Sequence, residues 1–493
     1  MRLVLALAAC AACTDNTVVV TPLIDIPTND TAQALALDTI TLSVAHAGAD
    51  DDIAAATFSH GDALELPNVP FGDDLVVHMV GRIGSSEVAY GRTCAFSVRP
   101  DASIPSPHLF FSRAVKFGEL SQEPLPRLGG MAMMYRDGSG LLVAGTYPDE
   151  NGQPVALTQI ERFDPNTGGY DTLHEIERRY EAAVAIMGTG PDSRMVIVGG
   201  RDPVTSKGAD YVEVIEAERD TDRQYEKFFE PTMQRIGLTA TTLSDGRVVV
   251  IGGRCAIDCV TVNVDAGVDP AAVQEISVET GTTAVTTLTD AQLLHPRYGH
   301  TATRLTDELG AAVLVAGGLD ITTGLPIAEA ELFKPLAESF SDQFAAQMLV
   351  PRSRHQAVRL PDGSVLFIGG VDASGMPTRQ LELFSPLDAA FVAVGTLPET
   401  AGLVGMSATV LPDGRVLITG GQITVGGAPV DSAFIARLDP LDGTVDVVAT
   451  DRLAVPRTDH QATLLCDGTV LIAGGTTGQA SFERYNPPAL GRR

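Results

Sequence analysis

The stretch PRSRHQAVRLPDGSVLFIGG, residues 351–370, decides the fold expected for this chain. It contains an Asp-Gly dipeptide at 362–363 and an apolar run at 365–368 that ends in two glycines. Asp-Gly supplies the positive φ angles of a two-residue hairpin turn, so we expect two antiparallel strands joined there. The apolar run has no helical periodicity, which is typical of a strand buried on both faces.

The same pattern recurs through the C-terminal three-quarters of the chain. An apolar run ending in glycine marks seven copies, the first of them degenerate, whose first glycines are Gly145, Gly199, Gly252, Gly317, Gly369, Gly420 and Gly474. Successive copies are 54, 53, 65, 52, 51 and 54 residues apart. A regular period of this size predicts repeated supersecondary units.

Each copy contains four expected strands. After the glycine pair comes a third strand with the pattern Glu-x-Phe/Tyr-x-Pro, as at 382–386 and 483–487. A fourth, less regular stretch leads to the Pro-Arg that opens the next copy. Four antiparallel strands per repeat are typical of a propeller blade, so the seven copies predict a seven-bladed β-propeller over residues 114–493.

The two ends of this region predict how the ring closes. The last copy stops after its third strand, at 483–487, whereas a strand-like segment at 115–120 precedes the first copy. We therefore expect residues 115–120 to supply the fourth strand of the last blade. Closure of this kind removes the exposed sheet edges that otherwise invite pairing with other chains.

The order Pro-Arg-x-x-His, Asp-Gly, Val-Leu-x-x-Gly-Gly and Glu-x-Phe/Tyr-x-Pro resembles the kelch repeat, in the form found in galactose-oxidase-like propellers. The resemblance covers roughly residues 115–493 and implies an all-β fold class with a seven-bladed kelch β-propeller. It implies little about activity, because kelch propellers serve both as enzymes and as binding platforms.

Residues 14–113 do not fit the repeat. Short strand-like runs, such as 39–44, 74–80 and 94–98, alternate with turns rich in Gly, Asp and Pro. They predict a small, Ig-like β-sandwich domain before the propeller. A true antibody-type domain is not supported, because the chain contains no Trp. Residues 14–35 are polar and Thr-rich, which suits a tether.

The amino terminus has the order of a signal peptide. Arg2 precedes a short apolar run, and Leu7-Ala8-Ala9-Cys10 resembles the bacterial lipobox. We predict a lipoprotein signal peptide over 1–13 with lipidation at Cys10; Cys13 is a second candidate, and a plain secretory signal is the alternative. The protein is then expected at the outer membrane, facing the periplasm or the cell surface, through its lipid anchor. Otherwise it is secreted.

The charge balance excludes some classes of partner. The formal net charge is −28, with 62 acidic and 34 basic residues. Binders of nucleic acid or of anionic membranes present a basic field, so we expect no nucleic-acid partner. Contact with a membrane is expected through the lipid anchor only.

Four cysteines lie outside the leader. Cys255 and Cys259 fall within an insertion in the 65-residue repeat, and export to an oxidising compartment would allow them to form a disulfide. Half of a zinc site is the alternative, but no second Cys/His pair lies nearby in the sequence. Cys94 and Cys466 are expected as buried thiols.

The resemblance to galactose oxidase raises the hypothesis of a copper site. His300, His355 and His460 each follow a repeat arginine by three residues. Such regular offsets favour a structural role between blades over metal binding. The stacking Trp of that family is also absent, so we predict no cofactor, no metal site and no catalytic residue.

The repeat arginines are the candidate ligand-binding residues: Arg127, Arg179, Arg235, Arg297, Arg352 and Arg457. The sixth copy departs from the pattern, with Leu403 near that position. The resemblance implies a ring of guanidinium groups at one channel mouth, where they would match the carboxylates of an acidic glycan or protein. The alternative is that each arginine pairs with a carboxylate or carbonyl of its neighbouring blade.

These observations favour binding over catalysis. We expect an exported, lipid-anchored kelch propeller that acts as a binding or interaction module at the cell envelope, with a protein or an acidic glycan at one propeller face. The alternative is a carbohydrate-active enzyme of galactose-oxidase-like or sialate-mutarotase-like type. The latter would also need an acid/base carboxylate, and the sequence does not single one out.

Overall fold

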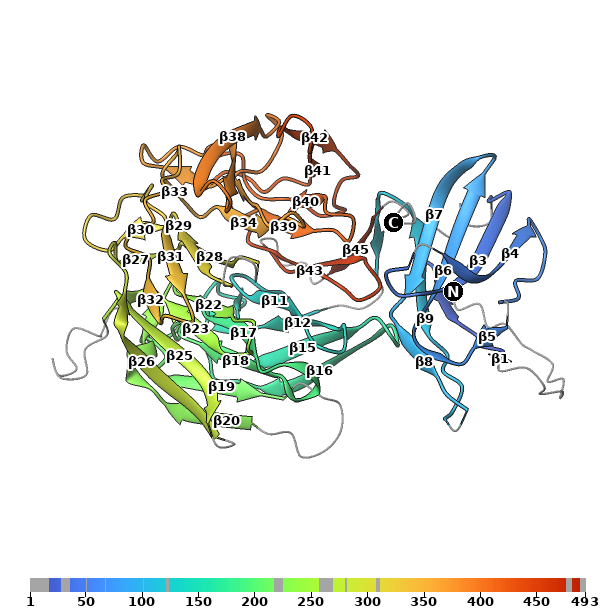
Figure 1. Ribbon diagram of the computed structural model, residues 1–493, viewed down its shortest axis with the longest axis horizontal. Coiled ribbons are helices and arrows are strands. Elements are labelled where there is room, and N and C mark those ends of the chain that lie inside the picture. The colour runs from blue at the N-terminus through green and yellow to red at the C-terminus, as the bar shows by residue number, and fades with distance from the viewer. Residues whose placement is uncertain are drawn as a thin grey trace.

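A computed structural model describes residues 17–27, 36–49, 51–66, 68–100, 102–120, 124–216, 225–256, 269–279, 282–306, 311–475 and 481–487. Strands dominate these residues, and the helices among them are two short 3₁₀ turns, η1 (Gly190–Asp192) and η2 (Pro231–Met233). None of the described helices is long and apolar enough to cross a membrane. Figure 1 shows a ring of strands beside a separate N-terminal sheet.

Seven four-stranded antiparallel sheets form the blades of a seven-bladed β-propeller. From the innermost strand outward, blade 1 consists of β11 (Met131–Met134), β12 (Gly140–Val143), β15 (Gln159–Asp164) and β16 (Gly169–Glu175); blade 2 of β17 (Ala183–Met187), β18 (Arg194–Val198), β19 (Tyr211–Ile215) and β20 (Tyr225–Phe229); and blade 3 of β22 (Thr239–Thr242), β23 (Val248–Ile251), β25 (Ala272–Glu279) and β26 (Thr282–Gln292). Blade 4 consists of β28 (Thr301–Arg304), β29 (Val313–Ala316), β31 (Glu331–Lys334) and β32 (Ser339–Phe340), and blade 5 of β34 (Gln356–Arg359), β35 (Val365–Ile368), β37 (Gln380–Ser385) and β38 (Ala390–Thr396). Blade 6 consists of β39 (Ser407–Val410), β40 (Val416–Thr419), β41 (Ala433–Leu438) and β42 (Val445–Ala449), and blade 7 of β43 (Gln461–Leu464), β44 (Val470–Ala473), β45 (Phe482–Asn486) and β10 (Lys116–Glu119).

The expected closure of the ring is confirmed. Strand β10 pairs antiparallel with β45 and is the outermost strand of blade 7. Phe117 of β10 is buried, and its ring packs against Tyr485 of β45 with centroids 5.0 Å apart. Strand β10 thus contributes an apolar side chain, that of Phe117, to the core of the blade that it completes.

The apolar runs are the second strands of the blades, and they are buried on both faces as predicted. All four residues of β35 are buried, and they pack into clusters shared with the neighbouring blades. The glycine that follows, Gly369, lies against Met406 of the next blade. A Cβ on Gly369 would come within 2.5 Å of the Leu403 backbone carbonyl oxygen, so the close approach of the two blades requires glycine there.

The N-terminal region forms a seven-stranded sheet with the order β2 (Leu23–Asp25), β9 (His108–Arg113), β7 (Ser86–Thr93), β6 (Gly72–Ile83), β3 (Thr39–His46) and β4 (Asp52–Ser59), where β8 (Phe96–Val98) also pairs with β6. A two-stranded ribbon joins β1 (Thr17–Val18) to β5 (Val69–Pro70). The Ig-like sandwich stays a prediction. The tether expected over 14–35 needs correction, because β1 and β2 bring part of that segment into sheets.

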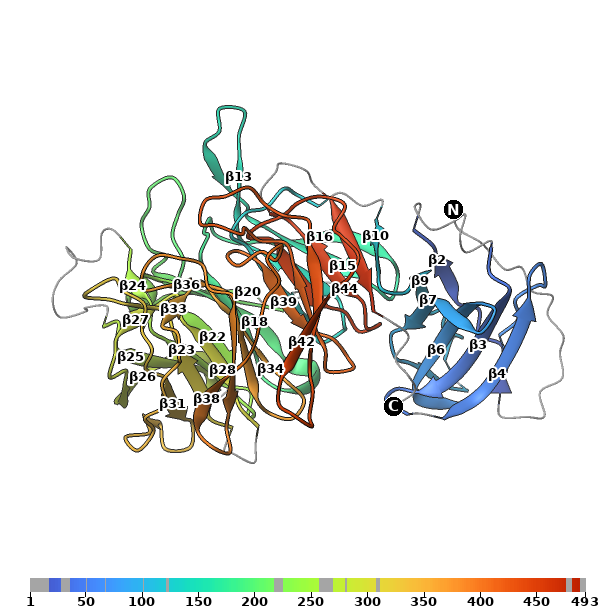
Figure 2. The same cartoon turned by 90° about the horizontal axis from the view of Figure 1, so that it is seen from above.

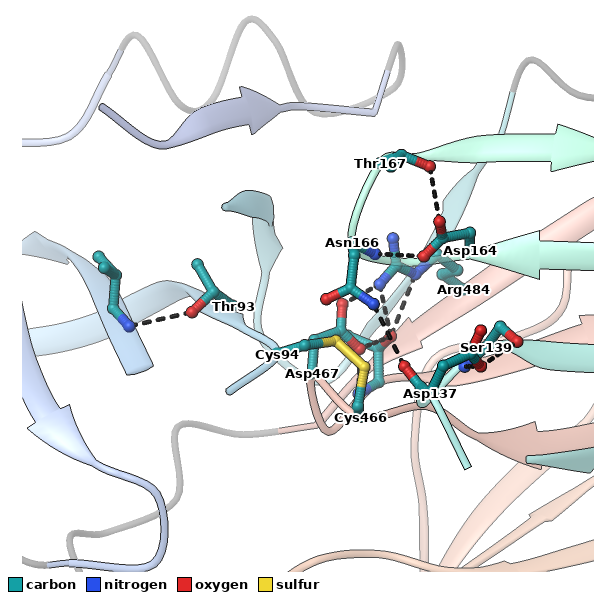
Figure 3. The surroundings of a disulfide bond; sticks show 12 residues. Thr93, Cys94, Asp137, Ser139, Asp164, Asn166, Thr167, Cys466, Asp467 and Arg484 are labelled. Carbon is teal, nitrogen blue, oxygen red and sulfur yellow. Dashed lines mark hydrogen bonds and ion pairs between the residues drawn. A yellow bond between two sulfur atoms is a disulfide. The ribbon is translucent and has the colours of Figure 1, made fainter. Parts of the chain in front are cut away.

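The N-terminal sheet is fastened to blade 7. Cys94 forms a disulfide with Cys466, with their Cα atoms 5.0 Å apart, so the expectation of two buried thiols was wrong. Beside the bridge, the Arg484 guanidinium pairs with Asp467 (Figure 3). It also lies 4.0 Å from the centroid of the Phe110 ring of β9. The Asn486 side-chain amide donates to a backbone carbonyl of the N-terminal sheet, that of Tyr90, at 2.8 Å.

Candidate functional site

One end of the propeller channel is marked by short two-stranded ribbons. They pair β21 (Arg235–Ile236) with β24 (Arg254–Cys255), β27 (Arg297–Tyr298) with β30 (Leu319–Asp320), and β33 (Arg352–Ser353) with β36 (Val371–Asp372). We call this end the ribbon face. The hairpin of β13 (Thr146–Pro148) and β14 (Pro154–Ala156) projects on the same side, and the N-terminal sheet lies beside the ring without covering it (Figure 2).

Three of the six repeat arginines, Arg235, Arg297 and Arg352, begin these ribbons, but all six side chains turn into the blades. Each is at most 1% exposed. The Arg297 guanidinium donates to Glu331 Oε1 at 2.8 Å and to the Glu329 carbonyl at 2.7 Å. The equivalent partners on the third strands of the other blades are Glu161 for Arg127, Glu213 for Arg179, Gln274 for Arg235, Glu382 for Arg352 and Glu483 for Arg457.

This arrangement favours the structural role that the sequence left open, with one difference. Each partner lies in the same blade as its arginine, not in the neighbouring one. Burial lowers the pKa of Arg297 and Arg352, while the adjacent glutamates oppose that shift. The structure therefore ties each loop that enters a blade to that blade's third strand, and it does not bring these guanidinium groups to the channel mouth.

Two blades vary this pair. In blade 3 the carboxylate is replaced by the Gln274 amide, and burial lowers the pKa of Arg235 to about 10. In blade 6 both members are replaced, by Leu403 and by Phe434, which lies at the strand position of Glu382. Both side chains are buried in one apolar cluster. The pair is thus interchangeable with an apolar contact, which is expected of a structural element.

The three repeat histidines are wedged between blades. The Nε2 atoms of His300 and His355 lie 3.0 Å from the Thr239 and Thr301 hydroxyl oxygens of the preceding blades, and that of His460 lies 2.8 Å from the Thr419 hydroxyl. Burial lowers the pKa of all three to about 3, so the rings are neutral. Within the described residues, no group of three or more His, Cys, Asp or Glu is arranged to hold a metal ion.

A different repeat position reaches the channel mouth. Two residues after each repeat arginine, or after Leu403 in blade 6, the backbone takes up a left-handed conformation. The residues at this position are Gly129, Glu181, Gly237, Gly299, Arg354, Gly405 and Asp459. A side chain costs roughly 1–2 kcal/mol in this backbone region, so glycine is the usual solution. Blades 2, 5 and 7 nevertheless present a charged side chain there.

A cavity of about 510 Å³ opens at this mouth. Its wall is built from the innermost strands of blades 1 to 5 and is lined mainly by small, uncharged side chains, including Thr239, Ala240, Thr301 and Ala302. Glu181, Arg254 and Tyr298 stand at its rim. The cavity therefore combines a neutral polar wall with a charged and aromatic edge, as small-ligand sites commonly do.

Two arginines lie in this region: Arg254 lines the cavity, and Arg354 holds in blade 5 the repeat position that Glu181 holds in blade 2. The Arg254 guanidinium lies 5.1 Å from the centroid of the Tyr298 ring, and its buried Nε has no hydrogen-bond partner within the described part of the chain. Arg354 is 48% exposed at its side chain, and its ion pair with Asp459 is long, at 3.9 Å. Glu181, in contrast, is held by Arg201 at 3.0 Å. Arg254 and Arg354 can therefore receive an anionic group.

Sequence reasoning missed Arg254 and Arg354. The signal for Arg354 was present, because four of the seven repeats have glycine at its position and three have a charged residue. Two other sequence predictions lie partly or wholly outside the described residues. Cys255 is disulfide-bonded, but its predicted partner Cys259 is not among those residues. Neither is the predicted lipidation site, Cys10.

A comparison with known proteins gives no relative to transfer a function from, since neither a protein-family model nor a curated protein matches the chain.

Proposed function

We propose that this protein is an exported, lipid-anchored propeller of kelch type that acts as a binding module at the cell envelope, and that its ligand binds at the ribbon-face mouth. The observation that carries this proposal is the cavity lined by Arg254, together with Arg354, which holds in blade 5 the repeat position that Glu181 holds at the cavity in blade 2. Both arginines are available to a ligand, whereas the six repeat arginines are occupied inside the blades.

Cysteine chemistry supports the proposed export. Cys94, Cys255 and Cys466 are all disulfide-bonded. Such bonds persist in oxidising compartments and are rare in the reducing cytosol. Together with the signal-like amino terminus and the lipobox-like Cys10, they favour a location outside the cytosol. Replacement of Cys10 by Ser should abolish incorporation of labelled fatty acid, and continued labelling would move the anchor to Cys13.

The chemistry of the mouth points to an anionic ligand. Guanidinium groups bind carboxylates through two parallel hydrogen bonds, and the aromatic face under Arg254 holds its guanidinium plane in place. Glu181 is the carboxylate that lines the cavity among the described residues, and its ion pair with Arg201 leaves it poorly placed for acid/base catalysis. We therefore propose recognition of a carboxylate-bearing glycan or protein, not its chemical conversion.

Binding arrays test this proposal. The soluble chain 14–493 would be applied to arrays of acidic and neutral glycans and of acidic peptides, beside the single variants Arg254→Ala and Arg354→Ala. Arg99→Ala is the matched control, because Arg99 is an exposed arginine of the N-terminal region. We expect acidic probes to bind and each mouth variant to weaken that binding about tenfold, as the loss of a charge-assisted contact implies. Equal binding by all variants would overturn the proposal.

A further inference from the structure

We propose that the ribbon face of blades 4 to 6 is a docking surface for a protein partner that presents apolar side chains beside a carboxylate. This inference rests on the proposed function, because it concerns the same face and names the class of partner. It is carried by a set of exposed apolar residues that we call the apolar arc: Leu294, Leu325, Leu349, Met376, Ile423 and Val425.

The apolar arc occupies equivalent loops of adjacent blades. Leu325, Met376 and the pair Ile423 and Val425 lie in the loops between the second and third strands of blades 4, 5 and 6. Leu294 and Leu349 lie in the connections that enter blades 4 and 5. The ribbons β27–β30 and β33–β36 join these loops and connections on the ribbon face (Figure 2).

These side chains are well exposed, from 40% for Ile423 to 69% for Leu294. Single exposed apolar residues are common on protein surfaces, whereas apolar residues gathered into one patch mark an interaction site, and these six lie in neighbouring loops of adjacent blades. The arc therefore calls for an explanation beyond the folding of the blades.

The fold itself does not require apolar residues at these positions. Leu325 and Met376 each precede a loop proline, and Gln153 occupies the corresponding position in blade 1. The position of Leu294 and Leu349, three residues before the repeat arginine, is held by Thr232 in blade 3 and by Ala454 in blade 7. Since other blades fold with polar or smaller residues there, the apolar side chains of the arc serve a partner.

The charges around the arc select the kind of partner. Arg354 of blade 5 lies in the connection that also carries Leu349, and its ion pair with Asp459 is long, at 3.9 Å, with a side chain that is 48% exposed. A carboxylate of the partner fits at Arg354, while the apolar arc contacts the apolar side chains that lie next to that carboxylate in the partner. An anionic lipid surface is disfavoured by the net charge of −28. A glycan is disfavoured because the arc has no aromatic side chain on which a sugar ring could stack.

Selection of binding peptides tests the inference with the full chain, purified in detergent. A random peptide library would be selected against the protein. The affinity of the selected peptides would then be measured for Leu325→Gln/Met376→Gln, a change that copies Gln153 of blade 1. The matched control is Leu336→Gln/Leu387→Gln, because these leucines of the same two blades are 89% and 91% exposed and lie in the turns at the opposite end.

We expect the selected peptides to combine a carboxylate with apolar neighbours. The arc variant should weaken their binding by about tenfold or more, as expected for the loss of buried apolar side chains. The control variant should bind as the original chain does. Both variants should keep the binding of an acidic glycan or peptide at the mouth, if such binding is found.

Three results would overturn the inference. Peptides weakened by Arg354→Ala but not by the arc variant would restrict recognition to the mouth and leave the proposed function intact. If neither Arg354→Ala nor the arc variant weakened binding of the selected peptides, that result would count against both the arc and the mouth. Binding to vesicles of neutral phospholipid that the arc variant abolishes, without any peptide binding, would identify the arc as a lipid contact.

Discussion

At the scale of single residues, the buried arginine is the most regular feature of the blades. Taking a charged pair out of water costs free energy that its mutual attraction only partly returns, so an apolar pair of similar size can replace it. Blade 6 shows this replacement, with Leu403 and Phe434 in the places of an arginine and a glutamate. Removal of only one partner is different, because it leaves a buried charge uncompensated.

We expect Arg352→Ala to lower the free energy of unfolding by about 3–5 kcal/mol, since it strands the buried Glu382 carboxylate. The double change Arg352→Leu/Glu382→Phe copies blade 6 and should lower the free energy of unfolding by much less. Urea unfolding followed by circular dichroism measures both. A double variant less stable than the single one would contradict a purely structural role for the pair.

The buried histidines make the fold sensitive to acid. His300, His355 and His460 have a pKa near 3 in the folded protein, against an ordinary value of 6.5. The unfolded chain therefore binds their protons first as the pH falls. Their contribution to stability is complete above pH 6.5 and is lost progressively between pH 6.5 and 3, at about 1.4 kcal/mol per pH unit for each histidine.

Blade 6 again supplies the variant that tests this dependence. Met406 occupies the position that His355 holds in blade 5, so His355→Met should fold and titrate one group fewer. We expect the unfolding free energy of the variant to fall less steeply than that of the original chain between pH 6.5 and 4. Parallel curves over that interval would show that His355 is not protonated on unfolding.

Prediction from sequence depended on whether the position of a residue repeats. The regular offsets of His300, His355 and His460 pointed to structural positions between blades, whereas the repeat arginines were the candidate ligand-binding residues, with pairing to the neighbouring blade as the alternative. Arg254 holds no repeated position and could not be placed in this way. Arg354 could have been, because it stands where four other repeats have glycine.

At the scale of elements, strand β10 joins the two halves of the molecule. Two residues separate it from β9 of the N-terminal sheet, and one of them, Val115, donates its backbone N–H to the Asn486 carbonyl at 2.8 Å. The strand could be predicted because the repeat leaves one blade a strand short. In contrast, β1 and β2 were missed, because strands of two and three residues carry no periodic signal.

We expect Phe117→Ala to destabilise the propeller by about 3–5 kcal/mol, because it leaves a cavity beside Tyr485 in blade 7. Val448→Ala on the exposed outer strand β42 is the control and should change stability little. Thermal unfolding would compare the two. A Phe117→Ala variant as stable as the control would show that β10 contributes little to closure.

At the scale of the whole molecule, the Cys94–Cys466 disulfide links the last blade covalently to the N-terminal region. Cys94 precedes the first blade and Cys466 lies in the last, 372 residues later. The chain between them passes through every blade, so blade 7 cannot separate from the N-terminal sheet while the bond is intact. The sequence offered the count of cysteines but not this pairing, because nothing local brings two residues so distant in sequence together.

The double variant Cys94→Ser/Cys466→Ser should lose about 2–5 kcal/mol of stability, the usual cost of removing a native disulfide. Urea unfolding without reducing agent measures the difference from the original chain. Equal stability would mean that the hydrogen bonds of Asn486 and the contact of Arg484 with Phe110 already hold the N-terminal sheet in place.

The central claim is that the ligand binds at the ribbon-face mouth, and hydrogen exchange of the protein with and without the tightest array ligand tests it most directly. We predict slower exchange in the segments that line the mouth, at residues 181–184, 236–240 and 298–303. Slower exchange confined to the N-terminal sheet, or to the turns at the opposite end of the blades, would contradict the claim.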